Sequence, residues 1–139
     1  MNNSINTRIE NLKSEFDVLD NPMDKYQYII DLGNEKEVVS QNIRKEQNLI
    51  KGCVSQAWMH FESRINPIKI ITDSDALIVK GLLSILEKLV NESSIEDIKK
   101  LNGSEILNNI GLGYSISSQR TNGFLSTLDK IKKQINTYE

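Results

Sequence analysis

The chain has 139 residues, and its 17 lysines and arginines against 19 aspartates and glutamates give a formal net charge of -2. A chain of this size is expected to form one domain, residues 1–139, around a single core. Because the two signs of charge are interleaved, no positive field is present that would bind a nucleic acid.

Cysteine usage and the apolar runs place the protein in the cytoplasm. The lone cysteine, Cys53, cannot form an internal disulfide, and residues 1–4 lack the charged and apolar parts of a signal peptide. The longest apolar run, residues 76–90, contains charged residues and is too short to cross a bilayer. We therefore expect a cytoplasmic protein that does not enter a membrane.

The N-terminal part predicts two amphipathic helices. In the first, behind a Ser4 cap, apolar residues recur at helical spacing; they are Ile5, Ile9, Leu12 and Phe16. The second has Asn21 as N-cap and Pro22 at its first position, and we expect it to end at Gly33. Its predicted apolar face is Met23, Tyr26, Ile29 and Ile30. The polar residues 34–48 predict a surface connection with at most a short helix.

A pattern of period two follows the cysteine and predicts a strand from Val54. One face would hold Ala57, Met59 and Phe61, and the other Trp58, His60 and Glu62. Residues 64–67 predict a turn and residues 68–72 a second strand, so the two most simply form an antiparallel hairpin. Residues 73–75 are expected to end this strand and to cap the next helix.

The remaining residues predict four helices, so the expected fold is α+β, a small antiparallel sheet with helices packed on it. Residues 75–91 are apolar nearly all round except for one polar stripe, which consists of Lys80, Ser84, Glu87 or Lys88, and Asn91. Gly81 would cost roughly 1 kcal/mol relative to alanine, so we interpret it as a point of close backbone packing. Short helices are expected over residues 93–101, with a capping box from Ser93 to Glu96, and over 103–111. The last helix should start near residue 117 or 118 and bury Phe124, Leu128, Ile131 and Ile135.

Cys53 is the candidate nucleophile, although a single intracellular cysteine is more often a small core residue. Gly52 gives the backbone freedom and leaves the sulfur uncrowded, and Lys51 favours the reactive thiolate. An unassisted thiol is only a few per cent ionised near neutral pH. This pattern indicates a carrier better than it indicates a fast hydrolase.

Other kinds of site find little support. A cysteine hydrolase needs a histidine within hydrogen-bond reach, but an extended chain places His60 about 20 Å from the sulfur. We interpret His60 as a partly exposed strand residue, Trp58 as core, and Asp73 and Asp75 as helix-start carboxylates. The residues predict no metal site, and residues 111–113 follow a helix where a dinucleotide site would need a strand.

Arg120 falls in the first turn of the last expected helix. A cation there opposes the helix dipole by a few tenths of a kcal/mol or more, so local stability does not explain this residue. Two interpretations stay open, a carboxylate partner within the fold and a contact to another protein.

Five stretches of the chain belong together: YIIDLG (28–33), QN (47–48), KGCVSQAW (51–58), DSDALIVKGL (73–82) and ISSQRTNG (116–123). In this order and spacing they resemble the SufE family of sulfur-acceptor proteins, over most of the chain. The cysteine stretch departs from the family in two places, because Val54 stands for the usual glutamine and Ala57 for the usual valine. Both changes are expected to affect loop mobility or partner choice and to leave the chemistry intact.

The resemblance implies the α+β fold shared by SufE and the IscU-like scaffold proteins. It also implies a partner, a SufS-like cysteine desulfurase that holds pyridoxal phosphate (PLP), and a recipient, a SufBCD-like iron–sulfur scaffold. Cys53 corresponds to the cysteine that carries the persulfide, and Arg120 to an arginine linked with desulfurase docking. We assign Lys51 and Gly52 to the partner-binding surface as well, and expect no cofactor or metal on this chain.

The chemistry of sulfur transfer agrees with these residues. A Cys53 thiolate would attack the outer sulfur of the donor persulfide, and this requires an accessible sulfur but no base on the acceptor. One alternative is a non-catalytic binding module that regulates a desulfurase or a scaffold while Cys53 packs in the fold. A stand-alone thiol hydrolase or peroxidase ranks below both the sulfur carrier and the binding module. The sequence leaves open whether the protein forms a homodimer.

Overall fold

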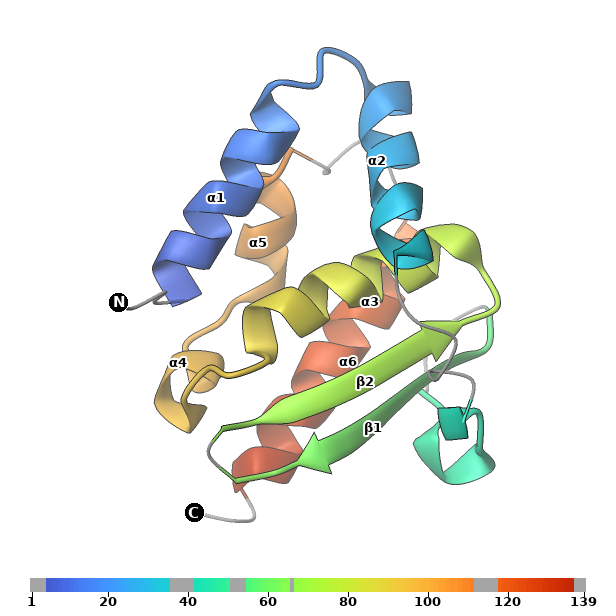
Figure 1. Ribbon diagram of the computed structural model, residues 1–139, viewed down its shortest axis with the longest axis vertical. Helices are drawn as coiled ribbons and strands as arrows, with labels where there is room; N and C mark the ends of the chain where they lie inside the picture. Colours follow the sequence, from blue (N-terminus) through green and yellow to red (C-terminus); the bar gives the residue numbers. More distant parts are fainter. Residues whose placement is uncertain (1–4, 36–41, 51–54, 66, 112–117, 137–139) are drawn as a thin grey trace.

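The computed structural model describes residues 5–35, 42–50, 55–65, 67–111 and 118–136, with the backbone alone for 118–120 and 136. In chain order, the elements are α1 (Ile5–Asp17), α2 (Pro22–Asn34), the 3-10 helix η2 (Glu46–Asn48), β1 (Ala57–Ser63), β2 (Lys69–Ser74), α3 (Leu77–Val90), α4 (Ile95–Lys99), α5 (Gly103–Asn109) and α6 (Ser118–Asn136). The predicted α+β class is confirmed (Figure 1). No helix among the described residues is long and apolar enough to span a membrane.

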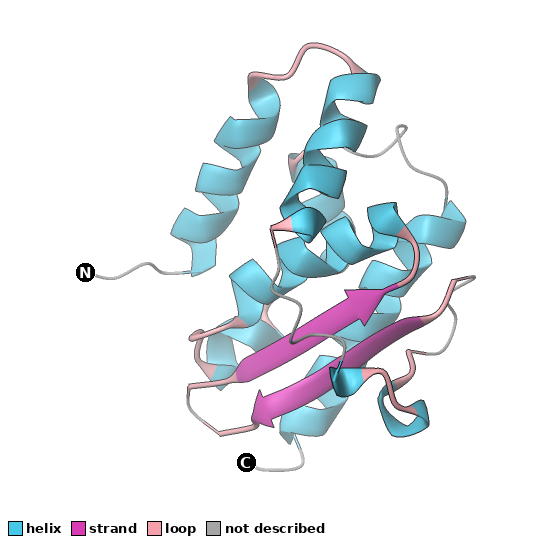
Figure 2. Ribbon diagram, turned by 45° about the vertical axis from the view of Figure 1, so that its right-hand side comes forward, coloured by secondary structure: helices cyan, strands magenta, loops and turns pink. Residues whose placement is uncertain are grey.

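The sheet is the predicted antiparallel hairpin, with β1 and β2 side by side (Figure 2). Its register runs from Ala57 opposite Ser74 to Phe61 opposite Ile70, with a bulge before Ser63. The second strand runs two residues beyond its predicted end at Thr72, because Asp73 and Ser74 still pair with β1, and it ends within residues 73–75 as predicted. The prediction that these residues cap the next helix is wrong, because Ala76 is the N-cap of α3 and makes no side-chain cap bond. The first strand begins at Ala57, and Val54 lies outside the described residues.

Helix α3 runs antiparallel to β2, and its polar stripe hydrogen-bonds to the strand. The Glu87 carboxylate accepts from the Thr72 backbone nitrogen at 2.7 Å, and Asn91 bonds to both the nitrogen and the oxygen of Ile70. Strand edges expose backbone groups that need partners, and these side chains provide them. The predicted stripe is therefore confirmed: Glu87 and Asn91 bond to the edge of β2. Lys80 lies 3.9 Å from the Asp73 carboxylate, and Ser84 donates to the Leu32 oxygen on α2.

Helix α3 begins at Leu77, two residues later than predicted. Asp75 does not enter the helix because its backbone nitrogen donates to the Gln56 oxygen at 3.1 Å. The Ser74 hydroxyl accepts from the Ala76 nitrogen at 3.1 Å. Residues 74–76 thus form the corner between β2 and α3, and no acidic residue stands in the first turn of the helix.

Helices α2 and α3 cross with their backbones in close contact, as predicted from Gly81. A Cβ atom on Gly81 would lie 2.0 Å from the Ile29 carbonyl oxygen. The Asn21 cap of α2 is confirmed, because its side chain accepts from the Asp24 nitrogen at 2.9 Å. Two expectations for α2 are wrong: the helix continues past Gly33 to Asn34, and Met23 is 78% exposed because it precedes the part of α2 that packs on α3.

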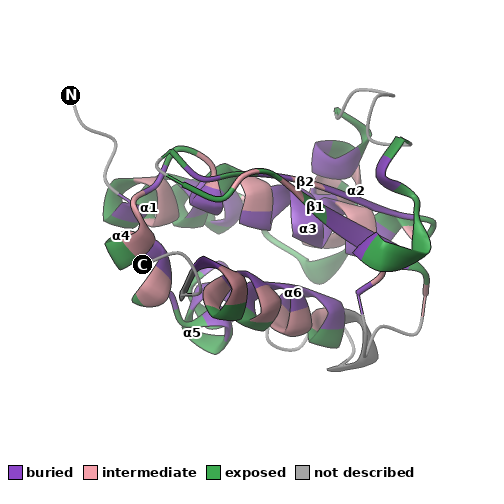
Figure 3. Ribbon diagram, turned by 90° about the horizontal axis from the view of Figure 1, so that it is seen from below, coloured by how far each residue is buried: buried purple, intermediate pink, exposed green. Residues whose placement is uncertain are grey.

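Helix α6 lies under α3 and the sheet and closes the core from that side (Figure 3). Its predicted buried residues are confirmed as Phe124, Leu128, Ile131 and Ile135. The predicted capping box at Ser93 is wrong, because Ser94 caps α4 by accepting from the Asp97 nitrogen. Ser93 instead donates to the Leu89 oxygen at the end of α3. The helices and strands thus enclose one hydrophobic cluster, and the short helix η2 contacts β1 of the hairpin.

Candidate functional site

The segment that leads to the cysteine, residues 42–50, lies against β1. Its turn is closed by the Asn48 side chain, which donates to the Ile43 oxygen at 2.9 Å. Leu49 then forms a bridge with Trp58, and the Ile50 nitrogen donates to the Ala57 oxygen at 2.8 Å. The predicted short helix here is confirmed as η2, but the expectation of a polar surface connection is incomplete, because Ile43 and Asn48 are buried.

The residues that follow the cysteine are fixed as well. The Gln56 oxygen accepts from the Ser74 hydroxyl at 2.8 Å and from the Asp75 nitrogen. With Ile50 bonded to Ala57, both ends of the cysteine stretch are tied to the hairpin. Cys53 is three residues after Ile50 and three before Gln56 in the sequence. The fold therefore fixes Ile50 and Gln56, the two residues between which Cys53 stands in the sequence.

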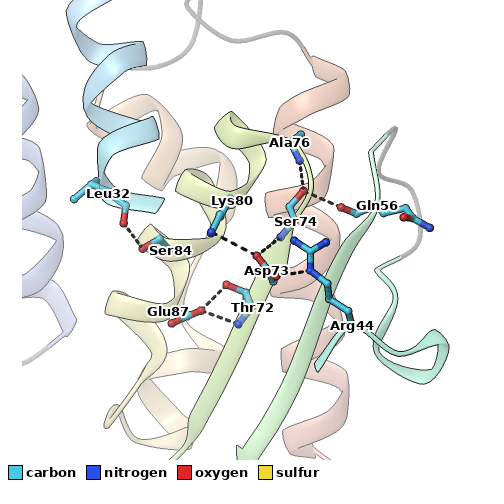
Figure 4. Close-up of polar contacts among 10 residues, drawn as sticks. All are labelled: Leu32, Arg44, Gln56, Thr72, Asp73, Ser74, Ala76, Lys80, Ser84 and Glu87. Atoms are coloured by element: carbon cyan, nitrogen blue, oxygen red, sulfur yellow. Dashed lines mark hydrogen bonds and ion pairs between the residues drawn. The ribbon is translucent and has the colours of Figure 1, made fainter. Parts of the chain in front are cut away.

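A charge cluster centred on a buried carboxylate lies beside these ends (Figure 4). The side chain of Asp73 is 1% exposed and accepts from Arg44 Nε at 2.7 Å. Its other oxygen accepts from the Ser74 nitrogen at 2.9 Å and lies 3.9 Å from Lys80 Nζ. The Arg44 guanidinium also stacks over the Trp58 ring, 4.6 Å from its centroid. Such a cation–π contact adds to the ion pair.

The expectation that Asp73 is a helix-start carboxylate is therefore wrong, and Arg44 was not among the predicted site residues. A buried carboxylate requires charged or hydrogen-bonding partners, and Asp73 has both. The signal in the sequence is an acidic residue at the end of an apolar strand, directly opposite a tryptophan in the hairpin register. Its partner lies 29 residues away, and local spacing does not show such a contact.

Between the 42–50 segment and α6 lies a groove of about 390 Å³. Leu49 and Ile50 form one wall, and residues 126–134 of α6 form the other. Lys133, on this wall, pairs with Asp129 at 3.0 Å. The cysteine stretch therefore begins at the edge of a groove that has an apolar wall and a charged one.

The predicted site residues fall in different parts of the structure. Lys51, Gly52 and Cys53 lie outside the described residues. Arg120 has its backbone in the first turn of α6, as predicted, and its side chain is not described. His60 is exposed on β1, as expected for a strand histidine. Among the described residues, no three histidine, cysteine or acidic side chains cluster in a way that would hold a metal.

The described residues form a small α+β protein in which a hairpin, an ion pair and a helix lie beside the two ends, Ile50 and Gln56, of a stretch that holds a single thiol in the sequence. A family model described as the SufE Fe–S metabolism associated domain matches residues 10–135. The chain belongs to the SufE family, and the resemblance found in its motifs is confirmed.

Relatives and a solved structure agree with this family. A SufE-like protein of Rhizobium etli is 32% identical over 130 residues, which are 91% of this chain and 88% of that protein. The cysteine desulfuration protein SufE of Wigglesworthia glossinidia brevipalpis is also 32% identical, over 88% of this chain and 86% of that one. The solution structure of a hypothetical protein from Thermus thermophilus has a TM-score of 0.73 and 13% identity over 94% of both chains. That last likeness shows the fold alone.

Proposed function

We propose that this protein accepts sulfur from a PLP-dependent cysteine desulfurase, carries it as a persulfide on Cys53, and delivers it to an iron–sulfur cluster scaffold. The observation that carries the proposal is that the two ends of the stretch with the single thiol are both anchored. In a chain of the SufE family, Cys53 lies between two ends, Ile50 and Gln56, that are both hydrogen-bonded to the hairpin. The name of the Wigglesworthia relative, a cysteine desulfuration protein, supports the same chemistry.

The transfer step is an exchange between thiol and persulfide. The Cys53 thiolate attacks the outer sulfur of the donor persulfide, a new S–S bond forms, the donor's S–S bond breaks, and the donor cysteine leaves as a thiolate. Because no electrons are gained or lost overall, the step needs no oxidant or reductant. PLP on the partner enzyme supplies the preceding cleavage of the cysteine C–S bond.

A single cysteine suits a carrier of this kind. A second thiol nearby would attack the persulfide, form a disulfide and release the sulfur as sulfide, and the chain has one cysteine. Under this proposal Lys51, Gly52 and Arg120 contact the desulfurase, and the protein works in the cytoplasm with a SufS-like enzyme and a SufBCD-like scaffold.

The proposal is tested by replacing the sulfur. Cys53→Ser keeps the size of the side chain and removes the acceptor, so we expect it to bind the desulfurase and no longer stimulate its turnover. The controls are the urea unfolding midpoint and the dissociation constant for the desulfurase, which should match those of the wild type. Stimulation retained by Cys53→Ser would contradict the proposal and favour a binding module.

A further inference from the structure

Arg44 connects the segment before the cysteine to the far strand of the hairpin. It lies six residues before Ile50, and its partner Asp73 lies on β2. The bond between Arg44 Nε and Asp73 Oδ2 is 2.7 Å long. Because the segment and the strand are distant in sequence, this contact determines where the 42–50 segment lies on the sheet.

Breaking this contact is costly because Asp73 is buried. With 1% of its side chain exposed, the carboxylate has lost nearly all of its water, so removing one charged partner would leave an uncompensated buried charge. Lys80 Nζ is 3.9 Å away, beyond hydrogen-bond distance. Arg44, of which 37% is exposed, therefore provides the charged hydrogen bond to this carboxylate.

Trp58 joins the ion pair to the end of the 42–50 segment. Its ring lies under the Arg44 guanidinium, its backbone pairs with Leu49, and it stands opposite Asp73 in the hairpin register. The 42–50 segment is thus attached to Trp58 at two points, Arg44 and Leu49. Ile50, which follows Leu49, bonds to Ala57. These contacts form a continuous path from Asp73 to the start of the cysteine stretch.

We infer that Arg44 is a positioning residue for sulfur transfer: its pairing with Asp73 and its stacking on Trp58 hold the 42–50 segment in the arrangement that the desulfurase binds. The inference rests on the proposed function. Without Arg44, the 42–50 segment would have to become ordered each time the desulfurase binds. Ordering the backbone of even one residue weakens the binding constant about tenfold. The concentration that gives half-maximal stimulation should therefore rise about tenfold, while maximal stimulation stays near that of the wild type.

Three variants of Arg44 and Asp73 test this role. Arg44→Lys keeps the charge but lacks the planar group that bonds and stacks, so we expect a rise in the half-maximal concentration. Arg44→Met removes the charge. Because it removes the charged hydrogen bond to the buried Asp73, it is combined with Asp73→Asn, and the double variant then has no buried carboxylate that lacks this bond. The matched control is Arg64→Met, since Arg64 also stacks on an aromatic residue of β1, 5.2 Å from the centroid of the Phe61 ring.

Each variant is titrated into a desulfurase that the wild type stimulates, and its urea midpoint is measured in parallel. A raised half-maximal concentration in the folded double variant and in Arg44→Lys, but not in Arg64→Met, would support the inference. An unchanged concentration in the folded double variant would overturn it, even if the urea midpoint fell, because the role of Arg44 would then be structural. An equal rise in Arg64→Met would overturn it too, since general surface charge would explain the effect.

The reaction of the single thiol with dithiodipyridine separates this inference from the proposed function. This small reagent needs no docking, so the double variant should react at least as fast as the wild type while stimulating the enzyme at a higher concentration. The positioning role would be overturned if the thiol of the double variant reacted more slowly with the reagent, by the same factor by which the half-maximal concentration rises. If Cys53→Ser stimulates as well as the wild type, the proposed function fails first and this inference with it.

Discussion

Gly81→Ala tests the close crossing of α2 and α3, on which the core depends. The new Cβ atom would lie 2.0 Å from the Ile29 oxygen, whereas real contacts are not shorter than 3.0 Å, so the helices must separate by about 3.0 − 2.0 = 1.0 Å. A gap of this size loses roughly a quarter to a half of the dispersion energy of the contacts at the crossing. Overpacking of this kind typically costs about 1–3 kcal/mol.

Helix propensity acts in the opposite direction. Alanine is favoured over glycine in a helix interior by about 1 kcal/mol, but here the neighbour is backbone, which cannot move aside as a side chain can. Because a backbone neighbour places the overpacking cost at the upper end of its range, about 2–3 kcal/mol, we expect a net loss of about 1–2 kcal/mol of unfolding free energy. In urea this corresponds to a midpoint lowered by about 0.5–1 M for a slope near 2 kcal/mol/M.

Gly103→Ala is the matched control, because its Cβ would meet Leu125 Cδ2 at 2.6 Å, the end of a flexible side chain. Its urea midpoint should change little. A Gly81→Ala protein as stable as the wild type, or more stable, would refute the described contact between the two helices.

Two further predictions concern α1 and α2. Arg8 Nη1 donates to the Asn91 oxygen at 2.7 Å and to the Leu89 oxygen at 3.3 Å at the end of α3, so Arg8→Ala should lower the unfolding free energy by about 1–3 kcal/mol in urea; an unchanged midpoint would contradict this cap. Burial, with a hydrogen bond to Glu15, raises the pKa of Tyr28 from 10.0 to about 12. Since the folded state favours the neutral phenol, this stability is complete below pH 10 and is lost as the pH rises through 12. The loss should be smaller in Tyr28→Phe, and identical pH profiles of unfolding free energy would exclude this effect.

The parts of the fold that local sequence patterns determine were predictable. The period-two pattern predicted the hairpin, and the helical spacing of apolar residues predicted the buried face of α6. The polar stripe of α3 was visible in the sequence, but its hydrogen bonds to β2 were not, because they depend on how the helix is docked. The exposure of Met23 likewise depends on which turn of α2 meets α3.

The charge cluster at the site was not predictable from local rules. An aspartate before a helix is well explained by the helix dipole, so the local sequence favours this interpretation for Asp73. The structure instead keeps Asp73 in the strand, where Arg44 and Lys80 compensate its charge. Arg44 itself stands in a polar segment and has no periodicity to mark it. The roles of Cys53, Lys51 and Arg120 stay predictions.

The central claim is that Cys53 carries the sulfur. It is tested most directly by an intact-mass spectrum, taken without reductant, after the protein is mixed with a cysteine desulfurase and cysteine. We predict that the wild type gains the mass of one sulfur atom and that Cys53→Ser gains none. A wild-type protein that stimulates the desulfurase and yet gains no mass, or a gain in both proteins, would contradict the claim.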